Sequence, residues 1–518
     1  MGMFQHALVV ACARRGKGEA VTNRSPASEL RCGVTDKQER TDRSNHLLPG
    51  GAAAACLAFA LLWWLFRDFT IDDVYIFLRY ARNIAEGHGI RYNIGDPPTE
   101  GVSSILWTLM LSALVRAGAE PLAAAKALGL IFGMSCVALT PLTVPQLRVG
   151  YRLLAAWLVA LSAPMVIWSA SGMGASFTAF YALIWILAVQ RSDLTSRNCL
   201  LLGILSAGGV LVRPEAALLW FAFVVFIILR RDTERGRALL LAAAGAVAVW
   251  LPLELFRLAY FGYPLPAPFY AKAVQPGFEQ HLRGIYYNYE FLIRYCGGPL
   301  ALMAAVYALA ARNGQGRQLR PAGLVVIAWL LWVIMVGDDW MPQFRFLVPA
   351  IPAIAATTAA VMERVSATLV RPRAVTMSMV AAVFALLFAS QGAGMWLARN
   401  TNRHYSGYRM QLSYHIRALD SLRSQGLYLR ENAAPGAVVA AYDIGIVGFI
   451  SEAKIIDMWG LTDYEMATLS PPERVSRVSK LKPDYWQVPW AHEQSDPDLL
   501  PHYQRVEGDR WGLHERVE

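Results

Sequence analysis

Two adjacent carboxylates, Asp72 and Asp73, open the segment DDVYIFLRYARNIAEGHG, which follows directly on a long apolar stretch, residues 47–66. Carboxylates buried without a partner at the mouth of a membrane span cost on the order of several kcal/mol, so they are solvated, paired or held for chemistry. A carboxylate can take a proton from a hydroxyl nucleophile, which makes the pair a candidate general base. The alternative is a helix cap, because Thr70-x-x-Asp73 resembles a capping box, but a cap uses only one of the two acids.

The residues after Asp73 recur with the spacing of an amphipathic helix. Apolar side chains fall on one face, and the other face carries Tyr75, Arg79, Arg82, Asn83 and Glu86. Such a helix lies on a membrane surface or on a helix bundle and does not cross the bilayer. Gly87 and Gly89 predict its end, and we take Tyr75 and Arg79 as candidate substrate-binding residues on it.

Two later segments carry charges that a purely structural bundle does not need. Arg213-Pro214-Glu215 places an Arg and a Glu at membrane depth, where charges face a cavity or a partner; a buried structural ion pair is the alternative. The Pro-rich segment PLPAPFYAK, residues 264–272, delivers Tyr270 and Lys272 to a surface, or is a rigid connection with a solvated Lys.

The segment GDDWMPQFR, residues 337–345, holds a second acidic pair. Its candidate substrate-binding residues are Asp338, Asp339, Trp340 and Arg345, against the alternative of a helix cap with an interfacial aromatic residue. By contrast, His88, Asn93 and Glu100 lie in a Gly- and Pro-rich stretch, and we expect them to be turn residues.

The composition limits the class of protein. The 518 residues are 55% hydrophobic and only 17% charged, which is too apolar for a soluble chain of this size. The net charge of +10 does not indicate nucleic-acid binding, because the Lys and Arg residues cluster between apolar runs as the positive-inside rule expects. The six cysteines are widely spaced without metal-site or disulfide patterns.

The apolar runs predict a polytopic α-helical membrane protein of eleven spans. They lie at 48–66, 122–142, 153–169, 175–190, 198–212, 214–229, 237–256, 292–311, 321–336, 346–362 and 374–394. Residues 102–115 are a short apolar stretch, and if they crossed, the basic loops would land opposite the basic N-terminus. We therefore expect a surface or re-entrant helix within one long outer loop, residues 67–121.

Three regions follow from this pattern. Residues 1–46 are polar and basic and predict a disordered cytoplasmic tail. Residues 47–396 form the membrane domain, and residues 397–518 have the composition of a small soluble α/β domain, which eleven spans place outside the cytoplasm. The expected location is the inner (plasma) membrane of a bacterium.

Acids, bases and aromatic rings thus gather on the outer face of the predicted bundle, and this set suits one kind of substrate. Carboxylates can accept a proton, Arg and Lys can hold a phosphate, and Trp and Tyr can stack on a sugar. An apolar groove between spans can hold a lipid tail. A sugar carried on a lipid phosphate needs all of these groups.

The order of these motifs resembles a known class. DDVYIFLRYARNIAEGHG, WSASGMGAS, VRPE, PLPAPFYAK, GDDWMPQFR and AYDIGIVGFISEAKIIDMWGLTD follow one another as in the GT-C class of polyprenyl-phosphate-dependent membrane glycosyltransferases, with the bacterial arabinofuranosyltransferases most similar. The resemblance implies inverting transfer from a polyprenyl-phosphate sugar on the outer face, with Asp72 or Asp73 as general base. The implied acceptor is a cell-envelope glycan, lipid or glycoprotein. Arg213, Lys272 and Arg345 are our candidates for the donor phosphate.

One residue departs from the pattern of the class. The WSASG motif there usually continues with a hydrophobic residue and Glu, but here Met173 is followed by Gly174, which puts the choice of sugar or acceptor in question. A divalent metal is possible in the class, but we see no ligand cluster beyond the two Asp pairs. The competing hypotheses are a lipid or solute transporter or flippase, and a membrane scaffold whose C-terminal region binds a partner.

Overall fold

The computed structural model divides into two compact units, Met1–Gly50 and Gly51–Glu518, and every element that bears on the site belongs to the second. The structure describes residues 46–230, 234–272, 278–295, 300–310, 314–368, 389, 392, 412–487, 502–506 and 512–517. Nearly all of the predicted tail, residues 1–46, and of the predicted span at 374–394 lies outside the described residues.

Several helices have the length and apolar character of membrane spans. Among the described residues there are five such segments, Leu47–Leu65, Pro121–Thr143, Arg235–Tyr260, Gly316–Val336 and Arg345–Thr368. The pair α7 (Val149–Ala160) and α8 (Ala163–Ser171), bent by 50°, is a sixth if counted as one span. Shorter apolar helices cover Ile105–Arg116, Ala175–Arg191 and Ser196–Val212. The chain is a multi-pass helical membrane protein, and the number eleven stays a prediction.

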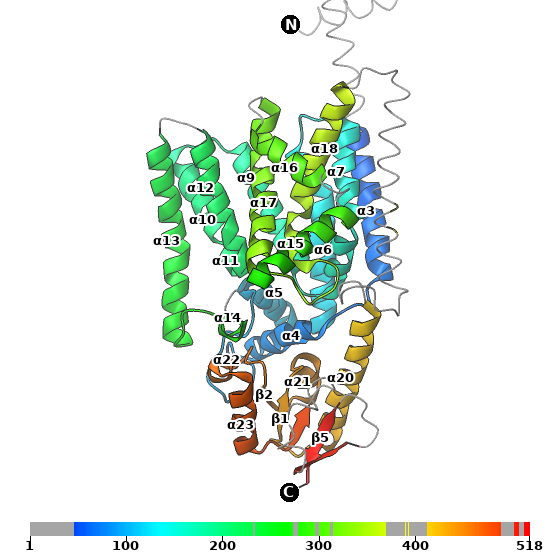
Figure 1. The fold of residues 1–518 in the computed structure, drawn as a ribbon, viewed down its shortest axis with the longest axis vertical. Helices are drawn as coiled ribbons and strands as arrows, with labels where there is room; N and C mark the ends of the chain where they lie inside the picture. Colours follow the sequence, from blue (N-terminus) through cyan, green and yellow to red (C-terminus); the bar gives the residue numbers. More distant parts are fainter. Residues whose placement is uncertain are drawn as a thin grey trace, which may run out of the picture. The chain divides into compact units, whose positions relative to one another are not determined.

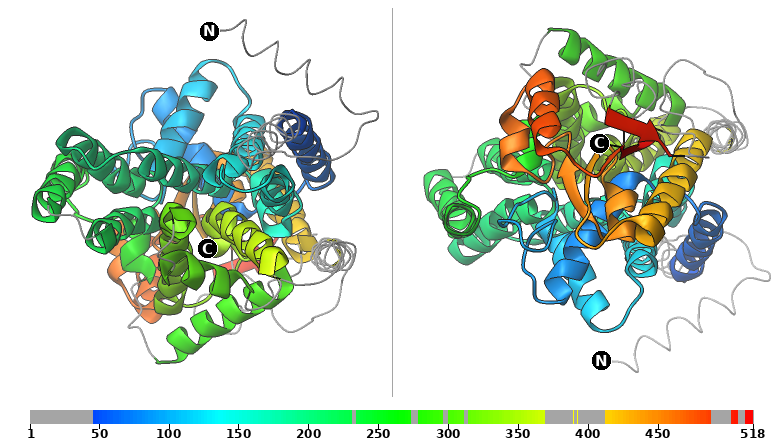
Figure 2. Two further views of the ribbon diagram at one scale, coloured as in Figure 1. Left: turned by 90° about the horizontal axis from the view of Figure 1, so that it is seen from above. Right: turned by 90° about the horizontal axis from the view of Figure 1, so that it is seen from below.

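The long helices of the bundle stand side by side (Figure 1). They are α3 (Leu47–Leu65), α6 (Pro121–Leu139), α9 (Ala175–Arg191), α10 (Ser196–Ala207), α12 (Leu218–Arg230), α13 (Arg235–Tyr260), α17 (Gly314–Val336) and α18 (Ile351–Thr368). Further helices connect or flank them: η1 (Thr140–Thr143), α11 (Gly209–Val212), η2 (Pro214–Ala217), α14 (Ala267–Lys272), α15 (Phe278–Tyr295), α16 (Leu300–Ala310) and η3 (Arg345–Ala350). Seen along the bundle, α3 and α13 lie at opposite margins (Figure 2).

One predicted span has different bounds in the structure. The apolar run at 292–311 is divided between the end of α15 and the whole of α16. The reason is that α15 is strongly amphipathic and carries charged residues such as Glu279, Arg283 and Glu290 along its length, which a spanning helix does not tolerate.

The amphipathic helix predicted after Asp73 is confirmed as α4 (Asp72–Ala85), and α5 (Ile105–Arg116) packs against it. In Figure 1, α4 runs across the ends of the long helices. Part of its polar face is buried, including Arg79 and Asn83, and helix α21 (Gly445–Ser451) packs against α4. α4 is therefore enclosed between the bundle and the C-terminal part of the chain.

The C-terminal α/β part comprises the described residues of 412–517. Its five-stranded sheet has the order β2-β1-β3-β5-β4, with β1 parallel to β2 and β3 and with β5 antiparallel to β3 and β4. The strands are β1 (Val438–Ala441), β2 (Lys454–Asp457), β3 (Tyr485–Gln487), β4 (Tyr503–Arg505) and β5 (Leu513–Arg516). Besides α21, its helices are α20 (Leu412–Asn432), α22 (Tyr464–Thr468) and α23 (Pro471–Leu481).

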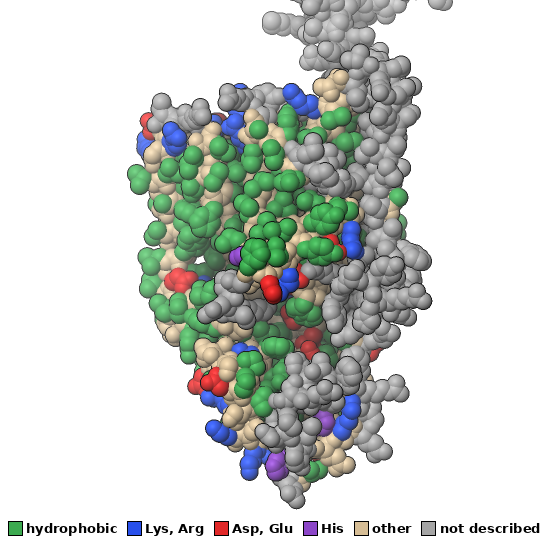
Figure 3. Space-filling view, viewed as in Figure 1, with side chains coloured by type: hydrophobic (Ala, Val, Ile, Leu, Met, Phe, Trp, Pro, Cys, Tyr) green, Lys and Arg blue, Asp and Glu red, His purple; other side chains and the backbone are tan. Residues whose placement is uncertain are grey.

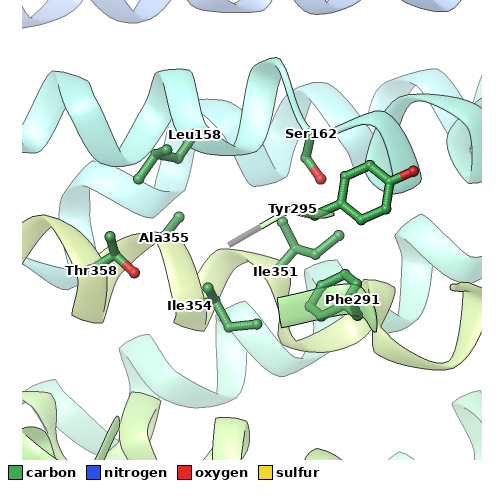
Figure 4. Close-up of a pocket in the computed structure, with 8 residues that line it drawn as sticks. All are labelled: Leu158, Ser162, Phe291, Tyr295, Ile351, Ile354, Ala355 and Thr358. Atoms are coloured by element: carbon green, nitrogen blue, oxygen red, sulfur yellow. The ribbon is translucent and has the colours of Figure 1, made fainter. Parts of the chain in front are cut away.

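The interior of the bundle contains one small cavity that is unsuited to a substrate. Its eight lining side chains include Phe291, Tyr295 and Ile351, as Figure 4 shows, and its volume is about 30 Å³. This space is about enough for a single water molecule. The Tyr295 hydroxyl at its edge donates a hydrogen bond to Gln343 Oε1 at 2.8 Å. A substrate site is therefore expected at the end of the bundle, around α4.

Candidate active site

The first residue of α4 is joined to the C-terminal α/β part by two hydrogen bonds. Asp72 Oδ2 accepts the N–H of Gly445 at 2.7 Å, and Asp72 Oδ1 accepts the N–H of Ile446 at 2.7 Å. The approach of the two backbones requires glycine, since a Cβ at Gly445 would lie 2.0 Å from the carbonyl oxygen of Asp72. Both oxygens of this carboxylate are thus engaged by α21.

The edge of the sheet next to Asp72 carries further polar side chains. Asp443 follows β1, Asp457 ends β2 and Gln487 ends β3, so all three lie at the carboxyl ends of parallel strands, where α/β sheets bind ligands. Gln487 Oε1 accepts the N–H groups of Tyr442 at 2.9 Å and Asp443 at 3.0 Å, and its amide donates to Asp443 Oδ2 at 3.3 Å. Gln487 therefore fixes the position of Asp443.

Burial raises the pKa values of Asp72 and Asp457, and neighbouring acids add to the rise at Asp72. Burial raises the pKa of Asp72 to about 8, and the negative charges of Asp443 and Asp73 add to the rise, while the two amide hydrogen bonds act against it. Burial likewise raises the pKa of Asp457 to about 6, although Asp457 accepts hydrogen bonds from Thr462 and two backbone amides. The group includes carboxyls that titrate near neutral pH, as acid–base chemistry requires.

Asp73 differs from Asp72 in its surroundings. It is half-buried in the first turn of α4, and it makes no hydrogen bond or ion pair to another described residue. Of the two adjacent carboxylates, Asp72 is committed to the C-terminal part of the chain and Asp73 keeps both oxygens available.

The WSASG motif reaches α4 from the bundle side. Thr70 Oγ1 donates to the carbonyl of Ser171 at 2.9 Å, and Gly172, with φ of +90°, lies against Val74. In the same motif, Trp168 Nε1 donates to the carbonyls of Pro342 and Gln343, both at 3.1 Å. The start of α4 is therefore contacted by two other sequence motifs, WSASGMGAS and AYDIGIVGFISEAKIIDMWGLTD. Trp168 of the first connects the segment GDDWMPQFR to them.

Gly174 has a structural explanation. It adopts a left-handed conformation, with φ of +72°, at the start of α9, and a Cβ there would lie 2.8 Å from the indole of Trp107. A larger residue at this position would have to displace Trp107, which is fully buried. Where the resemblance implies an acid, a side chain would meet the ring of Trp107.

The two arginines proposed for a phosphate each have an acidic partner. Arg213 forms an ion pair with Glu215, and Arg345 forms one with Asp339 through contacts of 2.8 and 3.1 Å. The first is the structural ion pair that the sequence left open as the alternative, and the second was not predicted. Arg213 nevertheless keeps a buried Nη1 without a hydrogen-bond partner among the described residues, and it lies between α11, which packs on α5, and η2.

The remaining predicted site residues contact different parts of the structure. Asp338 pairs with Arg283 at 3.2 Å, and the side chain of Trp340 is 58% exposed. Tyr270 packs against Tyr464 of α22, with ring centroids 6.0 Å apart. Lys272 ends α14, but its side chain lies outside the described residues. No contact among the described side chains joins these residues directly to Asp72 or Asp73.

Arg79 and Tyr75 have different roles in the structure. Arg79 donates to the carbonyls of Tyr92, Gly448 and Ala453 at 2.6 to 2.9 Å, so its guanidinium clamps α4 to the C-terminal part and has little left for a substrate. Tyr75 is half-buried, contacts the ring of Phe449 at 5.6 Å, and lines a large cavity.

Glu100 corrects our expectation of a turn residue. It is 1% exposed and accepts two hydrogen bonds from Arg257 of α13, at 2.8 and 2.9 Å. The signal that could have found this pair is Arg257 itself, because an arginine in an apolar run requires a buried partner. Asn93 is also more than a turn residue, since it exchanges hydrogen bonds with the backbone of Ile455 in β2 at 2.8 and 3.0 Å.

The residues of the site could hold a metal ion only through few ligands. Within the ranges that the structure describes, no three His, Cys, Asp or Glu side chains gather closely enough to form a metal site.

Comparison with known proteins gives matches to parts of the chain and to its fold. A family model described as a domain of unknown function (DUF8728) matches residues 409–515. A terminal beta-(1->2)-arabinofuranosyltransferase of Mycobacterium tuberculosis is 31% identical over 225 residues, which cover 40% of this chain. The matched segment spans 35% of the length of that relative.

Solved structures match nearly the whole chain. ArnT from Cupriavidus metallidurans, bound to undecaprenyl phosphate, has a TM-score of 0.59 at 14% identity, covering 90% of this chain and 97% of ArnT. The oligosaccharyltransferase AglB from Archaeoglobus fulgidus, in complex with an inhibitory peptide and a dolichol-phosphate, has a TM-score of 0.51 at 12% identity, covering 85% of this chain and 69% of AglB. The resemblance predicted from the ordered motifs is confirmed: the chain has the fold of the GT-C membrane glycosyltransferases.

Proposed function

We propose that the chain is an inverting glycosyltransferase that moves a sugar from a polyprenyl-phosphate donor to an acceptor of the cell envelope. The observation that carries this proposal is the acidic pair at the start of α4, one member held by α21 and the other unpaired among the described residues, within a GT-C fold. The lipid phosphates bound by ArnT and AglB support the nature of the donor.

The reaction is a single displacement. An acceptor hydroxyl gives its proton to Asp73, and the acceptor oxygen forms a bond to the anomeric carbon of the sugar. The bond between that carbon and the phosphate oxygen breaks, so polyprenyl phosphate leaves with the bonding electron pair. Asp72 orients this end of α4 through its hydrogen bonds from Gly445 and Ile446. Asp73 is the base, and a positioned general base contributes about 10² to 10⁴-fold to the rate.

Charge develops on the departing phosphate, and cations should meet it. Arg213 is the best-placed candidate, because its unpartnered Nη1 can donate to a phosphate oxygen while Glu215 keeps the guanidinium oriented. Lys272 and Arg345 remain candidates, the latter after exchange of its contact with Asp339. Glu215, Asp338, Asp339, Trp340, Tyr270 and Tyr75 stay proposed substrate-binding residues. Arg79 supports the site through the clamp described above.

The sugar we favour is a pentose such as arabinofuranose, because the curated relative is an arabinofuranosyltransferase. Acceptors in keeping with the proposal are a glycan, a lipid or a glycoprotein.

We place the reaction outside the cytoplasm. Lys and Arg side chains gather at the end of the bundle away from the C-terminal sheet, whereas hydrophobic side chains cover the middle (Figure 3). By the positive-inside rule this basic end faces the cytoplasm. Residues 1–46 are then a cytoplasmic tail, residues 47–396 the membrane domain with its outer loop 67–121, and residues 397–518 an extracytoplasmic domain of an inner-membrane protein.

The test is transfer by the purified full-length protein in nanodiscs. Polyprenyl-phosphate donors carrying labelled arabinofuranose or a hexose are supplied with cell-envelope acceptors, and both glycosylated product and released polyprenyl phosphate are measured. Production of both in equal amounts supports the proposal. Movement of the donor across a liposome membrane without any transfer would instead support the flippase hypothesis.

A further inference from the structure

A large cavity lies beside Asp72, between the end of α3, the start of α6 and α20. Its volume is about 660 Å³. Thr70, Tyr75 and Ile446 form the wall toward the acidic pair, and the last of these donates its amide to Asp72. Trp63 and Leu130, which belong to spanning helices, form the opposite wall. The cavity thus lies between the membrane-facing helices and the residues next to the proposed catalytic carboxylates.

The charges of this cavity balance. Arg67, Lys126 and Arg423 line it together with three acids, Asp68, Glu120 and Asp420, so the formal charges cancel. A site for a phosphate requires an excess of cationic donors, which this cavity lacks.

The cations that are present are also largely committed. Lys126 Nζ donates to the carbonyls of Arg67, Phe69 at 2.8 Å and Ala170 at 3.1 Å, which accounts for its three N–H bonds. Arg67 stacks on the ring of Trp64, 3.9 Å from its centroid, and lies 3.8 Å from Asp68. These side chains hold the rim of the cavity in place and leave few free donors for an anion.

The groups that remain available suit hydroxyls. The hydroxyl of Tyr75 and the side chains of Asp420 and Arg423 make no hydrogen bond or ion pair to another described residue, and they come from two different elements, α4 and α20. Alternating donors and acceptors next to the rings of Trp63 and Tyr75 match a sugar, which offers hydroxyls at its edge and C–H groups on its faces.

We propose that this cavity binds the acceptor of the transfer as a neutral, polyhydroxylated head group whose apolar part lies along α3 and α6. The inference rests on the proposed function and adds the place and chemical class of its acceptor. The donor phosphate is then expected at Arg213, which ends α11; α11 packs on α5, and α5 packs on α4.

The binding experiment uses the full-length protein in nanodiscs and requires no transfer. The neutral probes are octyl arabinofuranoside and octyl mannopyranoside, the anionic probe is dodecyl phosphate, and binding is followed by saturation-transfer NMR. Ala127→Trp fills the cavity from its α6 wall, and Ala138→Trp, on an exposed position of the same helix outside the cavity, is the matched control. Asp420→Asn is a milder variant that removes charge with little change of shape.

We expect the neutral glycosides to bind the wild type and the Ala138→Trp protein, and to bind the Ala127→Trp protein at least about tenfold more weakly, as the loss of one or two hydrogen bonds and of contact area implies. In transfer assays, Ala127→Trp and Asp420→Asn should raise the KM for the acceptor and leave the KM for the donor unchanged. Binding of dodecyl phosphate in place of the glycosides, a change in the donor KM, or no binding of any probe would each overturn the inference. If glycosides bind but the wild type transfers no sugar, the proposed function fails and the binding cavity stands.

Discussion

Asp72 and Gly445 are 373 positions apart in the sequence, yet the amide of Gly445 donates to the Asp72 carboxylate at 2.7 Å. The C-terminal α/β part therefore supplies a wall of the site around α4. An acid at the end of a membrane span costs less when backbone N–H groups solvate it, and α21 provides two of them.

Gly445→Ala tests this close approach. The added Cβ would lie 2.0 Å from the carbonyl oxygen of Asp72, a distance that no side-chain adjustment can relieve. We expect α21 to move away from α4 and transfer to fall by more than about tenfold, since a small misplacement of a reacting group is costly. Gly150→Ala is the control, because nothing lies within 4 Å of its Cβ position. Equal activity of the two variants would show that the contact is dispensable.

The pKa of Asp72 predicts opposite pH trends for activity and stability. With a folded pKa of about 8 against an ordinary value of 3.8, the folded protein holds a proton between these pH values that the unfolded chain has released. The contribution of this carboxyl to stability therefore decreases as the pH rises from about 4 to about 8. Transfer should instead increase as the pH rises through about 8, because the ionised Asp72 accepts the amides of Gly445 and Ile446 that orient the start of α4.

The check is the thermal midpoint of unfolding and the transfer rate, each measured from pH 5 to 9 for the wild type and Asp72→Asn. As the pH rises, the thermal midpoint of Asp72→Asn should fall less steeply than that of the wild type. Parallel curves for the two proteins would assign the decline to other groups, among which Asp457, with a pKa raised to about 6, is the first to examine.

Breaking the buried pair of Glu100 and Arg257 should destabilise the fold. Arg257→Met leaves the Glu100 carboxylate, which is 1% exposed, without its bidentate partner, and the expected loss is about 3 to 5 kcal/mol. The double variant Glu100→Gln, Arg257→Met should recover part of that loss, because it leaves no unpaired buried charge. Denaturation of Glu100→Gln, Arg257→Met and the double variant in one detergent measures both effects. Additive losses in the double variant would contradict the pairing.

Gly174→Glu should not restore the acid found in relatives. The left-handed backbone disfavours any side chain by about 1 kcal/mol, and the new Cβ would meet the ring of Trp107 at 2.8 Å. We expect lower stability and lower transfer for this variant, with partial recovery when Trp107→Ala is added to make room. Higher activity of the single variant would mean that Trp107 can move and that the acid has a role here too.

The sequence was sufficient to predict what depends on local patterns. The periodicity after Asp73 predicted α4, the apolar runs predicted a multi-pass helical protein, and the order of motifs predicted the GT-C fold. The roles of Arg79 and Glu100 could not be predicted in this way, because each depends on a partner more than 150 positions away: Gly448 for the first and Arg257 for the second.

Local patterns also could not decide between catalytic and structural charges. Arg345 was predicted as a phosphate ligand, and nothing in the sequence indicated its ion pair with Asp339, which forms only through the folded turn where Gln343 and Phe344 have φ of 58° and 51°. The same holds for Asp72 and Asp73, which are equivalent in sequence. Their different surroundings appear only when α21 packs on α4.

The most direct test of the central claim compares Asp73→Asn with the wild type in sugar transfer from a polyprenyl-phosphate donor, with limited proteolysis of residues 412–517 as the check on folding. The proposed role of Asp73 as the proton acceptor predicts a rate lower by about 10² to 10⁴-fold with an unchanged proteolytic pattern. Full activity of Asp73→Asn would contradict it.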